Sequence, residues 1–228
     1  MKVSVIIPAL DEGLRIAQAI KRAWQAGGDE VIVVDGGSSD DTARQAAAAN
    51  CQLVSSPRGR ARQQNAGAAH ASGDVLLFLH ADNWLPAGGV DQIRRAMADP
   101  RVAFGGFRQR IEAVGIAYRL LEIGNLLRAA CLRRPYGDQG IFVRRGLFEA
   151  VDGFPDVPLM EDVLLAKRLA RQARPRVLRG PIFVSPRRWQ RRGILPQTLH
   201  NWSLLLRAKC GVPLHRLAAE YHVSATDE

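Results

Sequence analysis

Short apolar runs alternate with helix-like segments from the first residues of the chain. Four such runs stand at positions 3–7, 30–34, 51–55 and 74–79, and the first two are rich in Val and Ile. Runs of this length and composition are typical of strands that are buried on both faces of a sheet. They predict the first four strands of a mostly parallel β-sheet.

The segments between these runs carry helical signals. Apolar side chains recur at helical spacing between positions 16 and 24, and in SSDDTARQAAAAN Ser38 stands three residues before Asp41. The second pattern predicts a helix that opens with a capping box. The order β-α-β-α-β-α-β implies parallel strands with right-handed crossovers. The sequence therefore predicts one α/β domain, with a mostly parallel sheet flanked by helices.

The C-terminal stretch ILPQTLHNWSLLLRAKCGVPLHRLAAEYH predicts two amphipathic helices, split at Gly211-Val212-Pro213. The first helix carries an apolar stripe beside two basic residues: Leu199, Trp202, Leu205 and Leu206, then Arg207 and Lys209. Two interpretations are open. The stripe rests on an anionic bilayer as a peripheral contact, or it packs against the rest of the domain or a second subunit in a homodimer.

Length and cysteine content add limits. The 228 residues suffice for one well-packed domain without disulfide bonds. Cys51, Cys131 and Cys210 are widely separated, so neither a disulfide framework nor a zinc site is predicted. The apolar run before Pro8 is too short for a signal peptide, and no stretch approaches the ~20 apolar residues of a membrane span. We expect a cytoplasmic protein, with at most a peripheral contact at the inner face of the membrane.

The charge is strongly positive, with 32 Lys and Arg against 22 Asp and Glu, a formal net charge of +10. Such a chain favours anionic partners: a nucleotide, a nucleic acid or an acidic membrane. Many arginines fall in the second half and some of them are expected to be solvated surface: Arg133, Arg134, Arg144, Arg145, Arg187, Arg188, Arg191 and Arg192. Charge alone does not choose among these partners.

Polar residues follow three of the predicted strands. The first strand leads into PALDE, the second into DGGS at Asp35, and the fourth into His80-Ala81-Asp82. Ligands of parallel sheets bind beyond the carboxyl ends of the strands, and gathered acids there favour a cation or a hydrogen-bonding ligand. The first turn lacks G-x-G-x-x-G, so NAD is not predicted.

Five ordered motifs resemble those of the family 2 glycosyltransferases with the GT-A fold. They are VSVIIPALDE, VIVVDGGSSDDT, GRARQQNAGAAHASGDVLLFLHAD, GIFVRRGLFEAVDGF and LMEDVLLAKRL. Within that family the chain is most similar to a small bacterial subgroup associated by name with arsenosugar biosynthesis. The resemblance implies inverting transfer of a sugar from a nucleoside diphosphate donor, of the UDP type, to a hydroxyl acceptor of unknown identity, with Mg²⁺ or Mn²⁺.

The resemblance also implies a division of the chain. A GT-A domain would cover residues 1–190, with a nucleotide-binding half of about 1–100 and an acceptor half of about 101–190. A C-terminal helical extension would follow at 191–228.

The donor nucleotide is assigned by resemblance to one set of residues: Pro8, Ala9, Glu12, Asp35, Gly36, Arg62, Ala81 and Asp82. In this set Asp35 would accept a hydrogen bond from the base N3–H. Arg62 would lie near the diphosphate, in a helix whose N-terminus suits an anion. The alternatives are a turn-forming role for Asp35 and a surface salt bridge for Arg62.

Asp82 matches the last aspartate of the family's D-x-D element, which implies a metal ligand. One carboxylate together with two phosphate oxygens is a normal magnesium arrangement. His80 replaces the first aspartate, and imidazole suits Mn²⁺ or Zn²⁺ better than Mg²⁺. The identity of the metal therefore stays open. The alternative for His80 is a strand-end histidine bonded to a backbone carbonyl.

LMEDVLL matches the family's E-D signature ahead of a helix. Asp162 would be the catalytic base and Glu161 would orient the acceptor or the base. Adjacent acids are also ordinary residues of a first helical turn, where they complement the helix dipole.

Two less specific stretches supply candidates for contacts with the donor sugar or the acceptor. PYGDQGIF places Asp138 and Gln139 in a glycine-flanked loop before a strand, and SPRRWQRRG, with Arg188 and Trp189, resembles a basic-aromatic loop. Trp189 either stacks on a sugar or anchors the C-terminal helices. The processive Q-x-x-R-W element is not matched, so a long polysaccharide product is not predicted.

Other function classes stay open on the residues alone. A sugar nucleotidyltransferase of similar fold would show G-x-G-x-R after the first strand, which PALDEG does not supply. A non-enzymatic nucleic-acid or membrane-surface binding protein would explain the charge, but the convergent acids would repel phosphate. No nucleic-acid partner is therefore expected.

Overall fold

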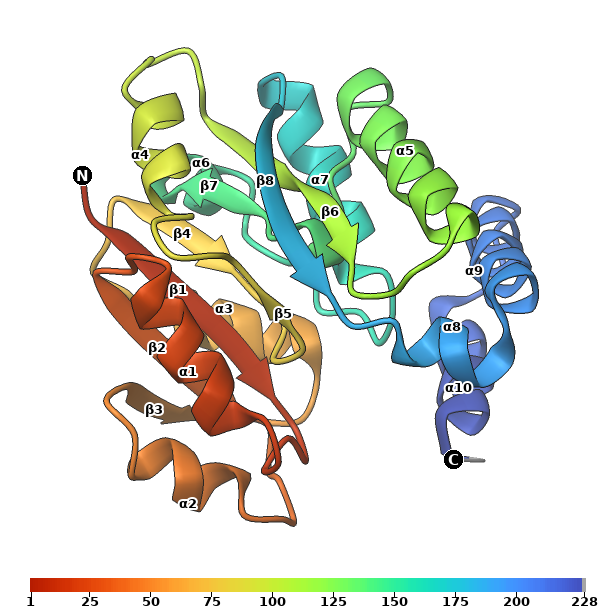
Figure 1. The fold of residues 1–228 in the computed structure, drawn as a ribbon, viewed down its shortest axis with the longest axis horizontal. Helices are drawn as coiled ribbons and strands as arrows, with labels where there is room; N and C mark the ends of the chain where they lie inside the picture. Colours follow the sequence, from red (N-terminus) through yellow and green to blue (C-terminus); the bar gives the residue numbers. More distant parts are fainter. Residues whose placement is uncertain (227–228) are drawn as a thin grey trace.

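A computed structural model describes residues 1–226. Its first half follows the predicted alternation of strands and helices: β1 (Val3–Ala9), α1 (Ile16–Gln25), β2 (Glu30–Asp35), α2 (Thr42–Ala47), β3 (Gln52–Ser55), α3 (Arg60–His70) and β4 (Val75–Phe78). All four predicted strands and the predicted helices are present, within a few residues of their expected ends (Figure 1).

The second half adds short strands and longer helices. They are β5 (Asn83–Trp84), α4 (Asp91–Met97), β6 (Phe104–Ile111), α5 (Ile116–Cys131), the 3₁₀ turn η1 (Gly137–Gln139), β7 (Phe142–Arg144), α6 (Arg145–Ala150), α7 (Glu161–Gln172), β8 (Arg176–Val184), α8 (Arg187–Arg192), α9 (Ile194–Lys209) and α10 (Leu214–Thr226). The split between the two C-terminal helices falls at the predicted Gly-Val-Pro.

One sheet joins the strands in the order β3-β2-β1-β4-β7-β6-β8-β5. Strands β3, β2, β1 and β4 are mutually parallel, and β6 also pairs parallel with β8. The antiparallel pairs are β4–β7, β6–β7 and β5–β8. The predicted α/β fold with a mostly parallel sheet is confirmed, and the carboxyl ends of β1, β2 and β4 meet at one edge.

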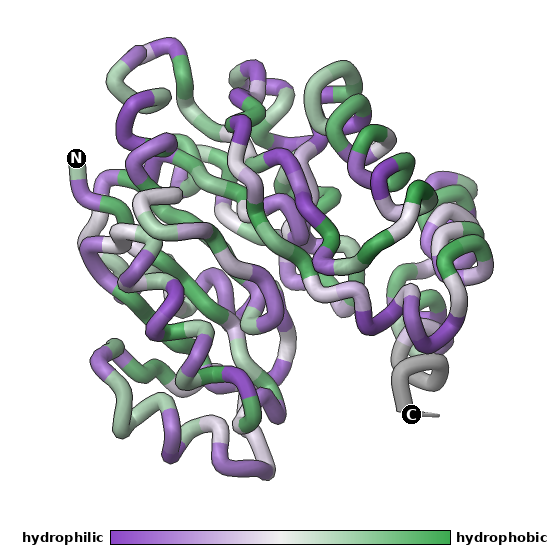
Figure 2. The backbone as a smooth tube through the Cα atoms, viewed as in Figure 1, coloured by the Kyte–Doolittle hydropathy of each residue, from purple (hydrophilic) through white to green (hydrophobic). Residues whose placement is uncertain are grey.

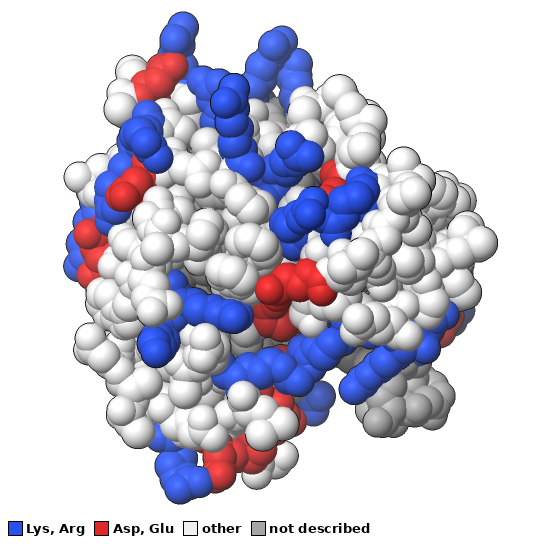
Figure 3. Space-filling model, viewed as in Figure 1, with Lys and Arg blue, Asp and Glu red and all other residues white. Residues whose placement is uncertain are grey.

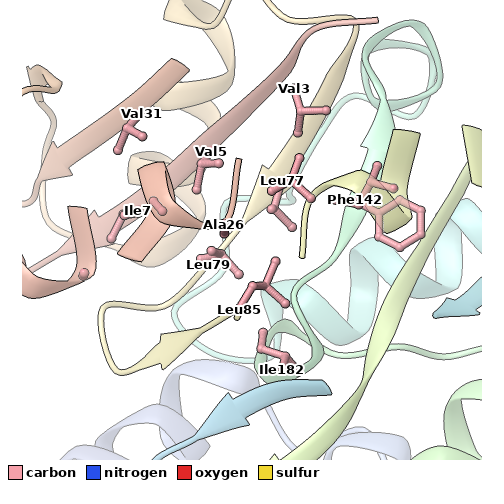
Figure 4. Close-up of a cluster of buried hydrophobic side chains, with 14 of the residues drawn as sticks. Val3, Val5, Ile7, Ala26, Val31, Leu77, Leu79, Leu85, Phe142 and Ile182 are labelled. Carbon is pink, nitrogen blue, oxygen red and sulfur yellow. The ribbon is translucent and has the colours of Figure 1, made fainter. Parts of the chain in front are cut away.

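Alternation along β1 divides the core into two layers. Val3, Val5 and Ile7 belong to a buried cluster that includes residues of α1, α2 and α4, part of which Figure 4 shows. Ile6 belongs to a second cluster, which includes residues of α3, α6 and α7. Side chains of a strand point alternately to the two faces of its sheet. Burial on both faces is the physical reason for the near-continuous apolar runs in the sequence.

The capping box predicted after β2 is wrong. Helix α2 begins at Thr42, Asp41 is its N-cap, and no side chain caps it. The Ser38 hydroxyl instead donates to Asp35 Oδ1 at 2.5 Å. The Ser38 side chain is therefore used to shape the loop beyond β2 rather than to start a helix.

The C-terminal helices pack on the domain through a third, small cluster. Leu204 of α9 and Leu217 of α10 are buried against Leu159, which lies just before α7. The predicted apolar stripe of α9 lies mostly on the surface, because Leu199, Trp202 and Leu206 are exposed, whereas Leu204, outside the stripe, faces inward. No helix among residues 1–226 is long and apolar enough to cross a membrane.

Candidate active site

The loops after β1 and β2 are joined by hydrogen bonds. The backbone N–H of Asp11 donates to Ser38 Oγ at 2.9 Å, and that of Glu12 donates to Thr42 Oγ1 at 2.8 Å. Glu12 Oε2 also lies 3.0 Å from Arg15 Nη1. Pro8 and Ala9 occupy the last two positions of β1. The turn assigned to the nucleoside is thus anchored to the loop that carries Asp35.

Asp35 is a buried residue at the end of β2. Its Oδ2 accepts from the backbone N–H of Gly37 at 3.1 Å and of Ser38 at 3.2 Å. The turn-forming role is therefore present in the structure. Two carboxylate oxygens offer about four acceptor sites, so these bonds leave capacity for a base N–H. The role of Asp35 in donor binding stays a prediction.

Gly36 is held by close packing against α3. The Gln63 side chain donates to the carbonyls of Ala9 at 2.7 Å and Val34 at 2.9 Å. A Cβ on Gly36 would come within 2.9 Å of that Gln63 side chain. Glycine at this position lets Gln63 bind the ends of β1 and β2 together.

A second group of polar residues lies where β4, η1 and α7 meet. The backbone N–H of Gly137 donates to Asp162 Oδ2 at 2.7 Å. A Cβ on Gly137 would lie 2.8 Å from His80 Nε2 and 3.2 Å from Asp162 Oδ2. His80 and Asp162 therefore flank Gly137. His80 and Asp162 are 82 positions apart in sequence but lie at one site. No direct hydrogen bond joins the two side chains in the described structure.

The two acids of the E-D motif have different surroundings. Asp162 is half-buried, and its Oδ1 also accepts from the Val163 N–H at 2.7 Å. Two backbone donors thus fix its carboxylate. Glu161 is only 5% exposed. Burial raises the pKa of Glu161, the charge of Asp162 adds to the rise, and Arg60 opposes it. Of the pair, Asp162 is the more accessible acid, as a base requires.

We expect Glu161→Gln to increase the free energy of unfolding, and to do so more at neutral pH than in mild acid. The raised pKa means that the folded state holds the Glu161 proton more tightly than the unfolded state. Stability is then lost as pH rises above the usual glutamate value. Glutamine keeps the shape and removes that cost. Urea unfolding of both proteins at two pH values measures it, and an equal difference at both would contradict the explanation.

His80 is held neutral by its surroundings. Burial lowers its pKa, and the positive charge of Arg60 lowers it further, while Asp82, Asp162 and Asp138 act in the opposite direction. A neutral imidazole is the form that binds a metal ion or accepts a hydrogen bond.

Arg60, the first residue of α3, is the functional candidate that the sequence did not reveal. Burial lowers the pKa of its guanidinium, but the charges of Tyr221, Glu161, Asp162 and Asp82 raise it overall. Arg60 is an exposed residue, and its charge interacts with those of the acids Glu161, Asp162 and Asp82. Its position at a helix N-terminus, in the same SPRGRA motif as Arg62, was the available signal.

Arg62 lies one half-turn further along α3. Its Nε donates to Asp156 Oδ1 at 2.9 Å, and both side chains are more than half exposed. The surface salt bridge named as its alternative is therefore present. Contact with a diphosphate stays a prediction for Arg62.

The metal assignment can be tested against the donor set. Among the side chains that the structure describes, those of residues 1–221, no group of three or more His, Cys, Asp and Glu is arranged to hold a metal ion. Asp82 is one-third exposed, and its Oδ2 lies 3.6 Å from Arg187 Nη2. Ala81 lies between Asp82 and His80 and is half-buried. One carboxylate and one neutral imidazole fit a metal whose remaining ligands come from a bound diphosphate and water.

The loop before β7 is built around a buried glutamine. Gln139 is fully buried, and its Oε1 accepts from the Tyr136 N–H at 3.2 Å. Arg128 stacks on the Tyr136 ring at 3.6 Å. Gln139 thus supports the loop from inside. Asp138 Oδ1 is buried and has no hydrogen-bond partner among the described residues. An unpaired buried carboxylate oxygen is costly, which favours a ligand contact at Asp138.

SPRRWQRRG forms the short helix α8, not the predicted loop. Arg188 is hydrogen-bonded to the Tyr221 hydroxyl of α10, and its Cζ lies 5.5 Å from that ring. The Trp189 indole nitrogen is buried without a hydrogen-bond partner in the described part of the chain. Both interpretations of Trp189, sugar stacking and anchoring of the C-terminal helices, therefore stay open.

Figure 3 shows acidic side chains near the middle of one face of the molecule, with Lys and Arg above and below them.

The comparison with protein families decides the assignment. A sequence profile of glycosyl transferase family 2 matches residues 4–149, which carry the loops after β1 and β2, α3 and His80-Ala81-Asp82. The chain belongs to this family. No curated protein sequence gives a significant match. The narrower resemblance to the bacterial subgroup stays a prediction.

Solved structures of glycosyltransferases share the fold. S. aureus TarS in complex with UDP-GlcNAc is 18% identical, with a TM-score of 0.65 over 81% of this chain and 58% of that one. Glucosyl-3-phosphoglycerate synthase from Mycobacterium tuberculosis, in complex with Mn²⁺, UDP and glucosyl-3-phosphoglycerate, is 20% identical, with a TM-score of 0.61 over 93% of this chain and 81% of that one. These likenesses confirm the GT-A fold of this family 2 chain.

A third structure has the highest identity of the three. The mannosyltransferase PcManGT from Pyrobaculum calidifontis, in complex with GDP-Man and Mn²⁺, is 25% identical, with a TM-score of 0.59 over 81% of this chain and 56% of that one. This family 2 chain spans 37% of the longer TarS chain and 58% of the shorter one. It therefore corresponds to only part of several of its structural neighbours.

Proposed function

We propose that the chain transfers a sugar from a nucleoside diphosphate donor to an acceptor hydroxyl, with inversion at the anomeric carbon. The observation that carries the proposal is the placement of Asp162. Its carboxylate is fixed by the Gly137 and Val163 N–H groups. Asp162 also lies close to His80. The charges of Arg60 and Asp82 both act on the pKa of His80. The proposed base would thus adjoin the proposed diphosphate-binding region.

The donor would lie across the carboxyl ends of three strands. Its base would contact Asp35 and the turn from Pro8 to Glu12, while its diphosphate would reach Asp82. Strands β2 and β4 are separated only by β1, so the loops that carry Asp35 and Asp82 leave the same edge of the sheet two strands apart. UDP is proposed as the nucleotide because a carboxylate accepts from uracil N3–H, and TarS and the mycobacterial synthase bind uridine nucleotides.

A divalent metal would bind together with the donor. Asp82 would hold it, with His80 as the second candidate ligand; Mg²⁺ and Mn²⁺ are both proposed, and two neighbours contain Mn²⁺. When bound, such an ion neutralises charge on the leaving diphosphate. Arg60 and Arg187, which lie near Asp82, would add positive charge on the same side.

Asp162 would take the proton of the acceptor hydroxyl as the oxygen attacks the anomeric carbon from the face opposite the diphosphate. The new C–O bond forms as the bond to the diphosphate breaks, which inverts the configuration. Glu161 would orient Asp162 or the acceptor, and Asp138, Arg188 and Trp189 are proposed to contact the donor sugar or the acceptor. The orphan oxygen of Asp138 supports its part in this proposal.

The proposal is tested by a screen of UDP-, GDP- and dTDP-sugars with Mn²⁺ and with Mg²⁺, measured by binding and by donor hydrolysis. Turnover of one donor class with release of the nucleoside diphosphate would support the proposal. Tight binding of oligonucleotides at moderate salt, without binding or hydrolysis of any donor, would overturn it.

We expect Asp35→Ala to weaken nucleoside binding about tenfold or more, because a charge-assisted hydrogen bond contributes ~1.5–3 kcal/mol. Calorimetry with the free nucleoside, without metal, measures this. Ser38→Ala is the matched control, since it removes the hydroxyl that bonds to Asp35 but keeps the carboxylate. Equal losses in the two variants would show that only the loop, and not the carboxylate, matters.

A further inference from the structure

Two helices of the second half present apolar side chains to solvent. Of the twelve large hydrophobic side chains that are exposed in the described structure, ten lie in two short segments. The first segment, on and beside α5, holds Val114, Ile116, Leu120, Ile123, Leu127 and Leu132. The second, on α9, holds Leu195, Leu199, Trp202 and Leu206. Such concentration on two helices differs from the single scattered residues that are normal on a protein surface.

Each set forms a stripe along its helix. On α5 the exposed residues follow the spacing 116, 120, 123 and 127, and on α9 the spacing is 195, 199, 202 and 206. Residues three and four apart share one face of a helix. Figure 1 shows both helices at the same end of the molecule, and Figure 2 shows hydrophobic residues recurring along them.

Both helices are held in place by their opposite faces. On α5, Glu122 is 3% exposed, accepts from the Ile111 N–H at 2.6 Å, and pairs with Arg119 at 2.9 Å. On α9, Leu204 is buried against Leu159 and Leu217. Both helices are therefore already packed on the domain through one face, and the exposed stripes lie on their other face.

The sequence around the stripes is rich in positive charge, although Arg207 of α9 is paired with Glu220 of α10. No Asp or Glu occurs between Asp162 and Glu220, an interval that contains thirteen Lys or Arg. Positions 123–137 also lack Asp and Glu and include Arg128, Arg133 and Arg134. The acid within α5, Glu122, is buried and paired with arginine.

We propose that the exposed faces of α5 and α9 together dock on the surface of an anionic phospholipid bilayer. An apolar stripe flanked by Arg and Lys is the pattern of a helix that lies in a membrane interface, and Trp202 is the side chain that such interfaces favour. A second copy of the chain fits less well, because a twofold contact through these faces would bring the same arginines together. The docking needs neither donor nor acceptor, so it stands apart from the proposed transfer reaction.

Flotation of the whole chain with lipid vesicles tests the docking. We expect binding to vesicles of equal parts phosphatidylglycerol and phosphatidylcholine, reduced binding at high salt, and little binding to pure phosphatidylcholine. The variants Leu120→Ser with Leu127→Ser on α5, and Leu199→Ser with Trp202→Ser on α9, should each weaken binding about tenfold or more. Leu14→Ser is the matched control, since Leu14 is 94% exposed but lies before α1.

The outcomes of these experiments distinguish a lipid bilayer from a second copy of the chain as the partner of the two faces. Loss of flotation in both double variants, with Leu14→Ser unchanged, supports the docking surface. Absence of flotation with anionic vesicles, or equal flotation of all variants, overturns it. Sedimentation velocity without lipid adds one more outcome: a dimer that dissociates in the same double variants would assign these faces to a second copy and overturn the membrane proposal.

Discussion

Asp162→Asn is expected to lower the rate of transfer at saturating acceptor by about 10² to 10⁴, the usual contribution of a positioned general base. Donor affinity should hardly change. The substitution keeps the size of the side chain and one oxygen that can accept from the Gly137 N–H, but it removes the basicity. The measurements are the transfer rate with the donor class found in the screen, and the donor Kd by calorimetry.

Glu161→Gln is the matched control for this prediction, because it neutralises the adjacent acid in the same helical turn. We expect it to act mainly through the acceptor KM. If Asp162→Asn keeps more than about a tenth of the wild-type rate, general-base assistance of the usual size is absent. Asp162 would then be an acid of the first helical turn that complements the helix dipole.

Asp82→Ala is expected to abolish turnover, with a loss of at least about 10³ in rate, since metal stabilisation of developing charge contributes several kcal/mol. The metal dependence of diphosphate binding should disappear with it. Affinity for the free nucleoside should remain largely intact, because Asp35 lies two strands away from Asp82. Calorimetry of nucleoside and nucleoside diphosphate, each with and without Mn²⁺, separates the two effects.

Asp99→Ala serves as the control for Asp82→Ala. Asp99 is also a carboxylate paired with an arginine, at 2.9 Å from Arg101 Nη2, but it lies in the loop before β6. Its loss should leave metal-dependent binding unchanged. Indistinguishable metal dependence in wild type and Asp82→Ala would remove Asp82 from the set of ligands, and Arg187 would then be its relevant partner.

Local sequence signals sufficed for the first half of the fold. The apolar runs of β1, β2 and β4 are nearly continuous and buried on both faces, so their pattern identifies them as strands. Local sequence signals gave wrong predictions where tertiary contacts compete with local ones. Ser38 has the chemistry of a helix cap, yet its hydroxyl is bonded to Asp35. Likewise, SPRRWQRRG reads as a loop, but it is helical in the structure.

The candidate site was predicted in part for the same reason. Residues in ordered motifs, such as Asp82 and Asp162, can be recognised from the chain. Arg60 carries only a weak signal, its place at a helix N-terminus, because its importance comes from acids in α7 and in the loop after β4, which are distant in sequence. The burial of Gln139 is equally invisible, since only the folded loop shows that its amide binds Tyr136 from inside. The sequence alone does not show which residues of distant segments come into contact, and the roles of Arg60 and Gln139 depend on such contacts.

The packing of Leu204 and Leu217 on Leu159 limits how modular the chain is. Leu159 stands two residues before Glu161, and Met160 between them has a left-handed backbone with φ of 67°. A truncation at residue 190 would uncover Leu159 and leave this strained connection without support. The C-terminal helices therefore cannot be exchanged between homologues as an independent structural unit. A chimera that replaces them must also match the residues that enter α7, or its acids will be displaced.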